Sequence, residues 1–178
     1  MELIEFNRES APPDVQAYLD PFEPAVLDGL DFGILARKDG AFVGHILLAI
    51  RPITPLMMGD LELHDFQGRD AARAILEAER EAFVLTFAVD SAHRRQGIGA
   101  ALQLAAVESC RRRGLRQMRS WSSHDKADNY RLKLRLGFAA VPGVQFIPRL
   151  GEWVPGAYFV LPLPVPMGSA GRLSRSEK

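Results

Sequence analysis

The sequence of 178 residues has little cysteine, no excess of either charge and no long apolar run. Its single cysteine, Cys110, cannot form an internal disulfide or a thiolate cluster, which is typical of a reducing compartment. Lysine plus arginine and aspartate plus glutamate number 22 each, so no net field favours nucleic acid. No segment reaches the roughly 18 apolar residues of a membrane span, and no signal peptide is evident. We therefore expect a cytoplasmic protein without nucleic-acid or membrane partners.

Motifs for metals and for common nucleotide sites are also missing. His45 and His64 have no second ligand at a metal-binding spacing, so we expect no metal and a structural or surface role for both. Cys110 falls late in an apolar helix pattern, where a buried small hydrophobe is expected. A Walker loop is absent, and Leu102 stands where a dinucleotide fold needs a third glycine.

The composition is that of an ordinary globular domain. With 47% hydrophobic and 25% charged residues, the chain can close a sizeable core. We predict one domain over residues 1–163, with an insertion at 52–80 beside the sheet. Residues 164–178 are rich in proline, glycine, serine and charge, so we expect a disordered tail.

Hydrophobic periodicity predicts an α/β chain. The Lys38-Asp39-Gly40 turn predicts a hairpin, and the alternation of strands and helices in the second half predicts an α/β arrangement. Beyond the hairpin, Gly114 and Gly137 are expected to end helices. The predicted strands lie at 3–6, 32–37, 41–51, 83–89, 115–122, 144–147 and 157–163, and the predicted helices at 12–19, 98–113 and 125–136.

A glycine-containing turn follows the apolar strand 83–89. It reads Arg94-Arg95-Gln96-Gly97-Ile98-Gly99-Ala100 and opens a helix. Free amides at a helix start bind phosphate oxygens, glycines allow close approach, and the two arginines supply positive charge. A helix entry with solvated arginines is the alternative. The turn predicts a pyrophosphate site.

Two landmarks carry a resemblance to a known family. Arg94-x-x-Gly97-x-Gly99 resembles the acetyl-CoA signature of the GNAT (GCN5-related N-acetyltransferase) superfamily, and Leu136-Gly137-Phe138 resembles its second landmark. The resemblance implies an α/β (α+β) fold whose mixed, mostly antiparallel central sheet is flanked by helices and splayed at the acetyl-CoA-binding strand. It also implies pantetheine pairing near Phe87 and Val89, with the pyrophosphate on Gln96, Gly97, Ile98, Gly99 and Ala100 and the charges of Arg94 and Arg95.

The same resemblance implies acetyl transfer from acetyl-CoA to a primary amine of a small molecule or peptide. The segments 52–80 and 141–155 would frame the acceptor cleft, because loops on a rigid sheet carry binding diversity. A non-catalytic acyl-CoA-binding regulatory module is the alternative, and a nucleotide-binding α/β protein is a third possibility. A homodimer is left open.

The catalytic residues of the family can be assigned to this sequence less directly. Many family members have a tyrosine acid four residues before the Gly-Phe pair, where this chain has Lys133; a strand glutamate base of other members corresponds to Phe83. Tyr130, one turn earlier, is a candidate acid, with simple aromatic packing as the alternative.

The remaining candidates lie just before that helix and in its first turn. His124 is a candidate base or acceptor contact, while Asp125 beside it is expected to cap the helix. Asn129 is a candidate cofactor contact. Lys126 stands where the family often has asparagine, and phosphate pairing and simple solvation are both open for it.

Overall fold

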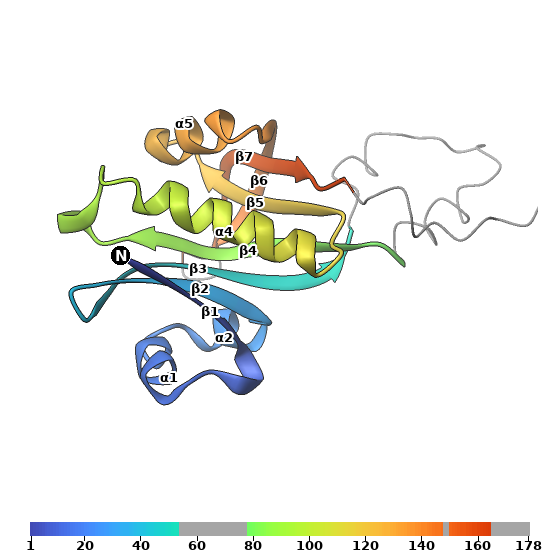
Figure 1. The fold of residues 1–178 in the computed structure, drawn as a ribbon. Helices are drawn as coiled ribbons and strands as arrows, with labels where there is room; N and C mark the ends of the chain where they lie inside the picture. The colour runs from blue at the N-terminus through green and yellow to red at the C-terminus, as the bar shows by residue number, and fades with distance from the viewer. Residues whose placement is uncertain (54–77, 148–149, 165–178) are drawn as a thin grey trace, which may run out of the picture.

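The computed structural model describes residues 1–53, 78–147 and 150–164. They form a seven-stranded sheet with helices on both faces (Figure 1). In the order of the sheet, the strands are β1 (Glu2–Asn7), β2 (Phe32–Lys38), β3 (Ala41–Pro52), β4 (Arg80–Val89), β5 (Gln117–Ser123), β7 (Glu152–Pro162) and β6 (Ala139–Ile147). The helical segments are η1 (Arg8–Ser10), α1 (Pro13–Leu19), α2 (Pro24–Asp28), η2 (Ser91–His93), α4 (Ile98–Arg112) and α5 (Ala127–Arg135).

Strand pairing is antiparallel everywhere except between β4 and β5, which run parallel. The mixed, mostly antiparallel sheet that the family resemblance implies is therefore confirmed. The predicted hairpin is also present, because β2 and β3 pair on either side of a turn in which Asp39 and Gly40 have positive φ. None of the described helices is long and apolar enough to cross a membrane.

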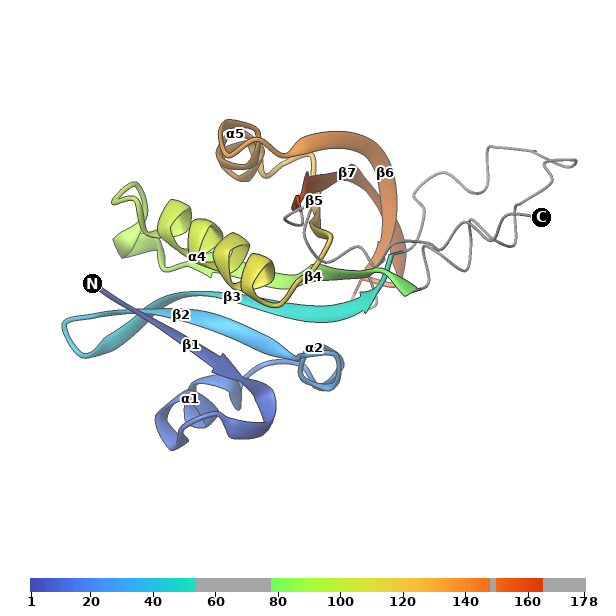
Figure 2. The same ribbon diagram turned by 45° about the vertical axis from the view of Figure 1, so that its right-hand side comes forward.

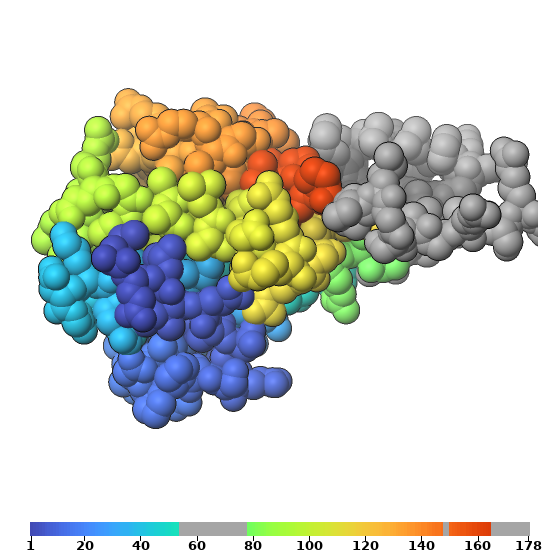
Figure 3. Space-filling model, in the orientation of Figure 1, coloured from blue at the N-terminus to red at the C-terminus, as the bar shows by residue number. Residues whose placement is uncertain are grey.

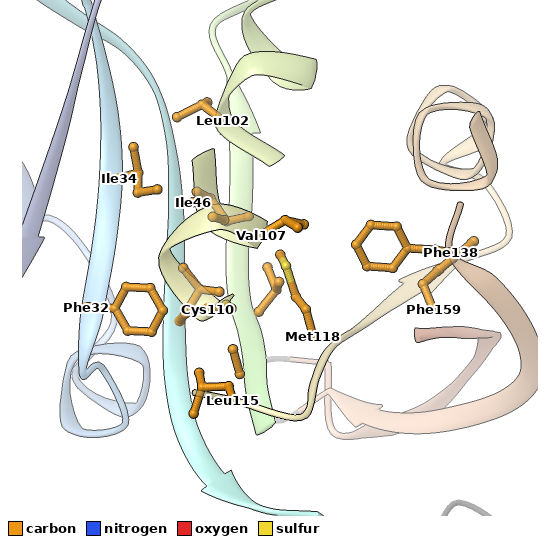
Figure 4. Close-up of a cluster of buried hydrophobic side chains, with 14 of the residues drawn as sticks. Phe32, Ile34, Ile46, Leu102, Val107, Cys110, Leu115, Met118, Phe138 and Phe159 are labelled. Atoms are coloured by element: carbon orange, nitrogen blue, oxygen red, sulfur yellow. The ribbon is translucent and has the colours of Figure 1, made fainter. Parts of the chain in front are cut away.

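The core has two layers because successive strand residues face opposite sides of the sheet. Ile34 belongs to a cluster with α4 and α5, whereas its neighbour Leu35 belongs to a cluster with α1 and α2. Figure 4 shows the first cluster, in which Leu102, Val107 and Cys110 of α4 lie over the sheet. Burial raises the pKa of the Cys110 thiol to about 12, which confirms its role as a core residue.

The strands β4 and β5 separate soon after they meet. Their parallel pairing covers only Glu81–Phe83 with Gln117–Arg119, and beyond it the two strands diverge (Figure 2). The register of β3 against β4 also shifts between Leu47 and Leu48. In the apolar strand 83–89, Phe83 and Val84 are buried, but from Leu85 onward the residues are only half-buried or exposed. The splay explains the difference, because β5 no longer lies beside this half of the strand.

Other differences concern short or interrupted patterns. The sequence did not predict α2, which has only five residues, too few for a periodic pattern. The strands β6 and β7 begin earlier than expected, since Pro142 and Gly143 interrupt the pattern of β6. Proline is tolerated there because β6 is an edge strand. The predicted disordered tail and most of the insertion at 52–80 lie outside the described residues.

Candidate active site

The turn before α4 has the main-chain geometry of an anion site. Arg95 and the N-cap Gly97 have positive φ values of 63° and 82°. The first helical bond joins the Ala101 N–H to the Gly97 carbonyl at 3.0 Å, so the amides of Ile98, Gly99 and Ala100 have no helical acceptor. The positive end of the helix dipole adds to their attraction for phosphate. Figure 3 shows this turn and α4 on the surface, between the N-terminal segment and α5.

Side chains of the turn are exposed, and some have neighbours that sequence reasoning missed. The Arg94 Nε donates to the Val89 carbonyl at 3.1 Å, which ties the turn to the end of β4. Gln96 accepts from the Lys38 Nζ at 2.9 Å, so the β2–β3 hairpin contributes a cation. Arg95 lies 3.4 Å from Asp128 of α5. No motif signals Lys38, because its proximity comes from the sheet.

The start of α4 lies directly against β4 and α5. A Cβ at Gly99 would lie 3.2 Å from the Phe87 ring, 3.6 Å from Leu132 and 3.7 Å from Val89. The structure thus brings Phe87, Val89 and Gly99 together, as the resemblance implies. Beyond Phe83 the main chain of β4 has no β5 partner in the described register, so its edge is open to a ligand.

Sequence candidates in and before α5 gather around the end of β5. The Asn129 Nδ2 donates to the Ser122 hydroxyl, and the Tyr130 hydroxyl donates to the Ser122 carbonyl, both at 3.1 Å. His124 lies 3.1 Å from the Gly156 carbonyl, and its ring meets Tyr130 edge-on at 6.2 Å. Burial raises the pKa of Tyr130. The structure therefore brings all three candidates to one place.

The expected Asp125 cap is wrong. The N-cap of α5 is Lys126, without a side-chain cap bond. Asp125 instead accepts from the Ser123 hydroxyl and pairs with Lys126 at 2.7 Å, and these neighbours lower its pKa. The cap position falls one residue later than the sequence pattern indicated, so the carboxylate of Asp125 contacts its own neighbours. Among the described residues, Asp125 is the ion-pair partner of Lys126.

A cavity of about 490 Å³ opens on the face of the sheet opposite α4. Residues of both diverging strands line it, and most of the lining residues are apolar or aromatic, with Glu23, Thr86 and Gln145 as the polar members. Its lining comprises Pro21, Phe22, Glu23, Val26, Phe83, Val84, Leu85, Thr86, Trp121, Gln145 and Ile147. Sequence reasoning missed Phe22, Val26 and Trp121, because isolated apolar residues carry no motif. Gln145 and Ile147 lie in the segment 141–155, which the sequence analysis expects to frame the acceptor cleft.

The carboxylate nearest to the expected strand base is not free. Glu81 is fully buried and accepts from the Arg51 Nε at 2.9 Å, from Gln117 at 2.6 Å and from Arg119. Two guanidinium groups so close engage its carboxyl oxygens in a structural hydrogen-bond network. A proton-accepting role for Glu81 has no support in this geometry.

His45 has the structural role expected for it. It lies 2.9 Å from the Tyr18 hydroxyl and 3.2 Å from the Thr86 hydroxyl, and burial lowers its pKa to about 4. His64 lies outside the described residues. Among the residues that the structure describes, no group of three or more histidine, cysteine or acidic side chains could hold a metal ion.

Comparison with protein-family models settles the family. A model described as the acetyltransferase (GNAT) family matches residues 2–138. The chain belongs to this family. The matched region contains the splayed strands, the glycine turn and α5, so the landmarks found in the sequence lie within it. A search of curated proteins finds no match.

Several solved GNAT structures share the fold over nearly their whole length. The "IAA acetyltransferase" of Bacillus cereus has a TM-score of 0.60 at 14% identity, covering 91% of this chain and 99% of that one. The ribosomal-protein-S18-alanine N-acetyltransferase of Escherichia coli gives 0.60 at 14%, covering 96% and 99%. Arabidopsis thaliana NAA60, solved with acetyl-CoA, gives 0.59 at 18%, covering 90% and 99%. At these identities the likeness concerns the fold.

Proposed function

We propose that the chain is an acetyl-CoA-dependent N-acetyltransferase that acetylates a primary amine of a small molecule or peptide. One observation carries the proposal: the strands β4 and β5 separate next to the start of α4, where main-chain amides have no helical acceptor. The separation supplies an open strand edge for an amide-containing arm, and the amides supply a site for its diphosphate. Membership of the GNAT family and the NAA60 structure with acetyl-CoA support the choice of donor.

The cofactor would be held mainly by main chain. Amides from Gln96 to Ala100 would bind the diphosphate, with Arg94 and Arg95 at its rim, and the edge of β4 at Phe87 and Val89 would pair with pantetheine. Asn129 lies on the facing helix and would complete the cleft through its buried, unpartnered Oδ1. These groups would bind and orient the thioester. The co-substrate itself would supply the acetyl group that is transferred.

Acetylation requires a neutral amine and a proton donor for the leaving sulphur. A free alkylamine has a pKa near 10.4, so a base or a water chain must take its proton before attack. We carry His124 forward as that base and Tyr130 as one candidate acid. The Tyr130 hydrogen is engaged with the Ser122 carbonyl, so this bond would have to be exchanged during turnover. A main-chain N–H of β4 would stabilise the oxyanion.

The cavity on the other face is the proposed acceptor site. It reaches the same diverging strands from the side opposite α4, so an amine bound there would meet the thioester through the splay. An apolar part of the acceptor would lie against Phe22, Val26 and Trp121. The carboxylate of Glu23, which also lines the cavity, would bind an ammonium group. We therefore propose an acceptor with one amine beside an apolar body.

Two measurements test the function. Calorimetry with acetyl-CoA, NAD and ATP should show binding of acetyl-CoA alone. A panel of arylalkylamines, polyamines, aminoacyl compounds and short peptides should then release free thiol above background, most strongly with an apolar amine. Absence of acetyl-CoA binding would refute the proposal. Binding without thiol release for any amine would favour the regulatory module instead.

A further inference from the structure

Lys133 is a buried cation without a partner. Its side chain in α5 is 1% exposed, and its Nζ has no hydrogen-bond partner in the described structure. The Nζ lies 5.0 Å from the centre of the Phe138 ring and 5.8 Å from that of Phe159. Figure 4 shows both rings on the α5 side of the core cluster. Lysine is rarely buried without a counter-charge, because the loss of solvation is costly.

Ser120 is a second unpartnered group beside the same ring. It is the first residue of β5 beyond the last β4 pair, Phe83 with Arg119, and its Cα partner on β7 is Phe159. Its hydroxyl is buried and has no partner among the described residues. Strand alternation puts Ser120 on the face of Met118, which packs in the cluster with α4. Two unpartnered polar groups thus flank Phe159 at the point where the strands diverge.

The length of β4 relates this point to the glycine turn. Gly99 packs against Phe87, and from Phe87 to Phe83 an extended strand covers about 13 Å. An extended pantetheine arm whose diphosphate lies at the turn covers such a span and ends near the divergence. Leu132, the residue before Lys133, also packs against Gly99, so α5 borders the same opening. The two unpartnered groups therefore lie where the thioester end would come.

We propose that Lys133 donates the proton that the coenzyme A sulphur receives when the thioester breaks. This inference rests on the proposed N-acetyltransferase function. The acceptor nitrogen forms a bond to the acetyl carbon, the carbon–sulphur bond breaks, and its electron pair goes to sulphur. Sulphur then takes a proton from the Lys133 ammonium, and the acceptor nitrogen loses one that returns to Lys133 through water.

The surroundings of Lys133 suit a group that gains and loses a proton near neutral pH. Burial lowers the pKa of this amine to about 7, and no charged neighbour is the cause. The rings of Phe138 and Phe159 lie 5.0 and 5.8 Å from its Nζ. Tyr130 of the same helix meets Phe159 edge-on, and His124 in turn meets Tyr130, so these are the ionisable side chains that face the same ring cluster. A surface lysine would hold its proton too tightly for this role.

The test compares Lys133→Met with the matched control Arg135→Met, which removes an exposed cation two residues away on α5. Methionine conserves volume and removes an unpaired amine, so the variant should fold and melt at a higher temperature than the wild type. We expect kcat to fall about 10²–10⁴-fold, the range for loss of an acid–base group, with the Kd for acetyl-CoA unchanged. Arg135→Met should keep the wild-type kcat.

The pH profile separates this role from a structural one. In the wild type, kcat should fall above neutral pH as Lys133 loses its proton, and Lys133→Met should lack this falling limb. Lys133→Tyr, which restores a donor at the same position, should recover part of the rate. Tyr130→Phe should keep the falling limb. A wild-type kcat and pH profile in Lys133→Met would overturn the proposal. If the wild type released no thiol with any amine, the function itself would fail instead.

Discussion

The two helices that border the splay between β4 and β5 offer different kinds of chemistry. At α4, the useful groups are main-chain amides, and the side chain of Arg95 beside them is 82% exposed. At α5, the useful groups are side chains held against the sheet, and Lys133 is 1% exposed. Water and salt screen the charges at the first site. At the second site, burial strengthens electrostatic interactions and shifts pKa values. Under the proposed function, α4 would bind the co-substrate by the position of its amides, and α5 would supply the groups that transfer protons.

The largest expected effect concerns stability at α5. Because the folded pKa of Lys133 is about 7 and its ordinary value is 10.5, the full cost of burying the ammonium is present below pH 7. Between these values the unfolded chain holds more protons, so stability rises with pH, and above 10.5 the cost is gone. Lys133→Met should remove a rise of a few kcal/mol, at 1.36 kcal/mol for each pKa unit.

Urea unfolding of the wild type and Lys133→Met at pH 7 and pH 10 measures this difference. Subtracting one protein from the other cancels groups such as Cys110 that titrate in both. Equal pH dependence in the two proteins would show that α5 does not bury a titrating amine, and the contrast with α4 would disappear.

At α4 the expected effect is on binding. Gly99→Val would put a branched side chain against Phe87, where even a Cβ lies at 3.2 Å, and would fill the approach to the amides. A steric overlap of this kind costs about 1–3 kcal/mol, so acetyl-CoA affinity should fall by about tenfold or more. Calorimetry measures it. Gly29→Ala is the control, because a Cβ there meets its neighbours at ordinary distances of 3.8 Å or more. Retained affinity in Gly99→Val would exclude the proposed diphosphate site.

The α4 side was largely predictable from the sequence, and the reason is local. A strand, a glycine turn and an apolar helix are contiguous, so the amides of Gly97 to Ala100 follow from the order of residues. The antiparallel hairpin of β2 and β3 was predictable for the same reason. The place of Lys38 near Gln96 was not, because it depends on how the sheet aligns two distant turns.

The α5 side could be predicted only in part. The helix, its stop at Gly137 and the substitution of Lys133 for tyrosine were all visible in the sequence. Burial of Lys133 was not, because it depends on Phe159 of β7, which is 26 positions further along the chain. The bond between Tyr130 and the Ser122 carbonyl likewise requires the register of β5 under the helix. The proposed acceptor cavity draws on α2, β4, β5 and β6, so no single motif indicates it.

A smaller effect, on acceptor binding, is expected for a residue of α2 that lines the proposed acceptor cavity. Val26→Phe should narrow the cavity, because Val26 lines it and is half-buried. We expect the KM for an apolar amine to rise about tenfold, within the range for a mismatch of a methylene or more. The Kd for acetyl-CoA should stay the same, because the proposed cofactor site is on the α4 face. Ala25→Phe, at an exposed neighbour outside the lining, is the control. A parallel loss of acetyl-CoA affinity would mean that the two sites are not on opposite faces.

The smallest effect is expected for the exposed charges at α4, and it bears directly on the contrast with α5. Arg95→Ala should weaken acetyl-CoA binding by less than about fivefold, because an exposed ion contributes at most about 1 kcal/mol. The loss should shrink further in high salt. Arg131→Ala is a matched control, since Arg131 is similarly exposed and contacts the same Asp128 carboxylate at 3.3 Å from α5. A much larger loss in Arg95→Ala would show that side-chain charge dominates over the main-chain amides, and α4 would then bind by charge as well as by position.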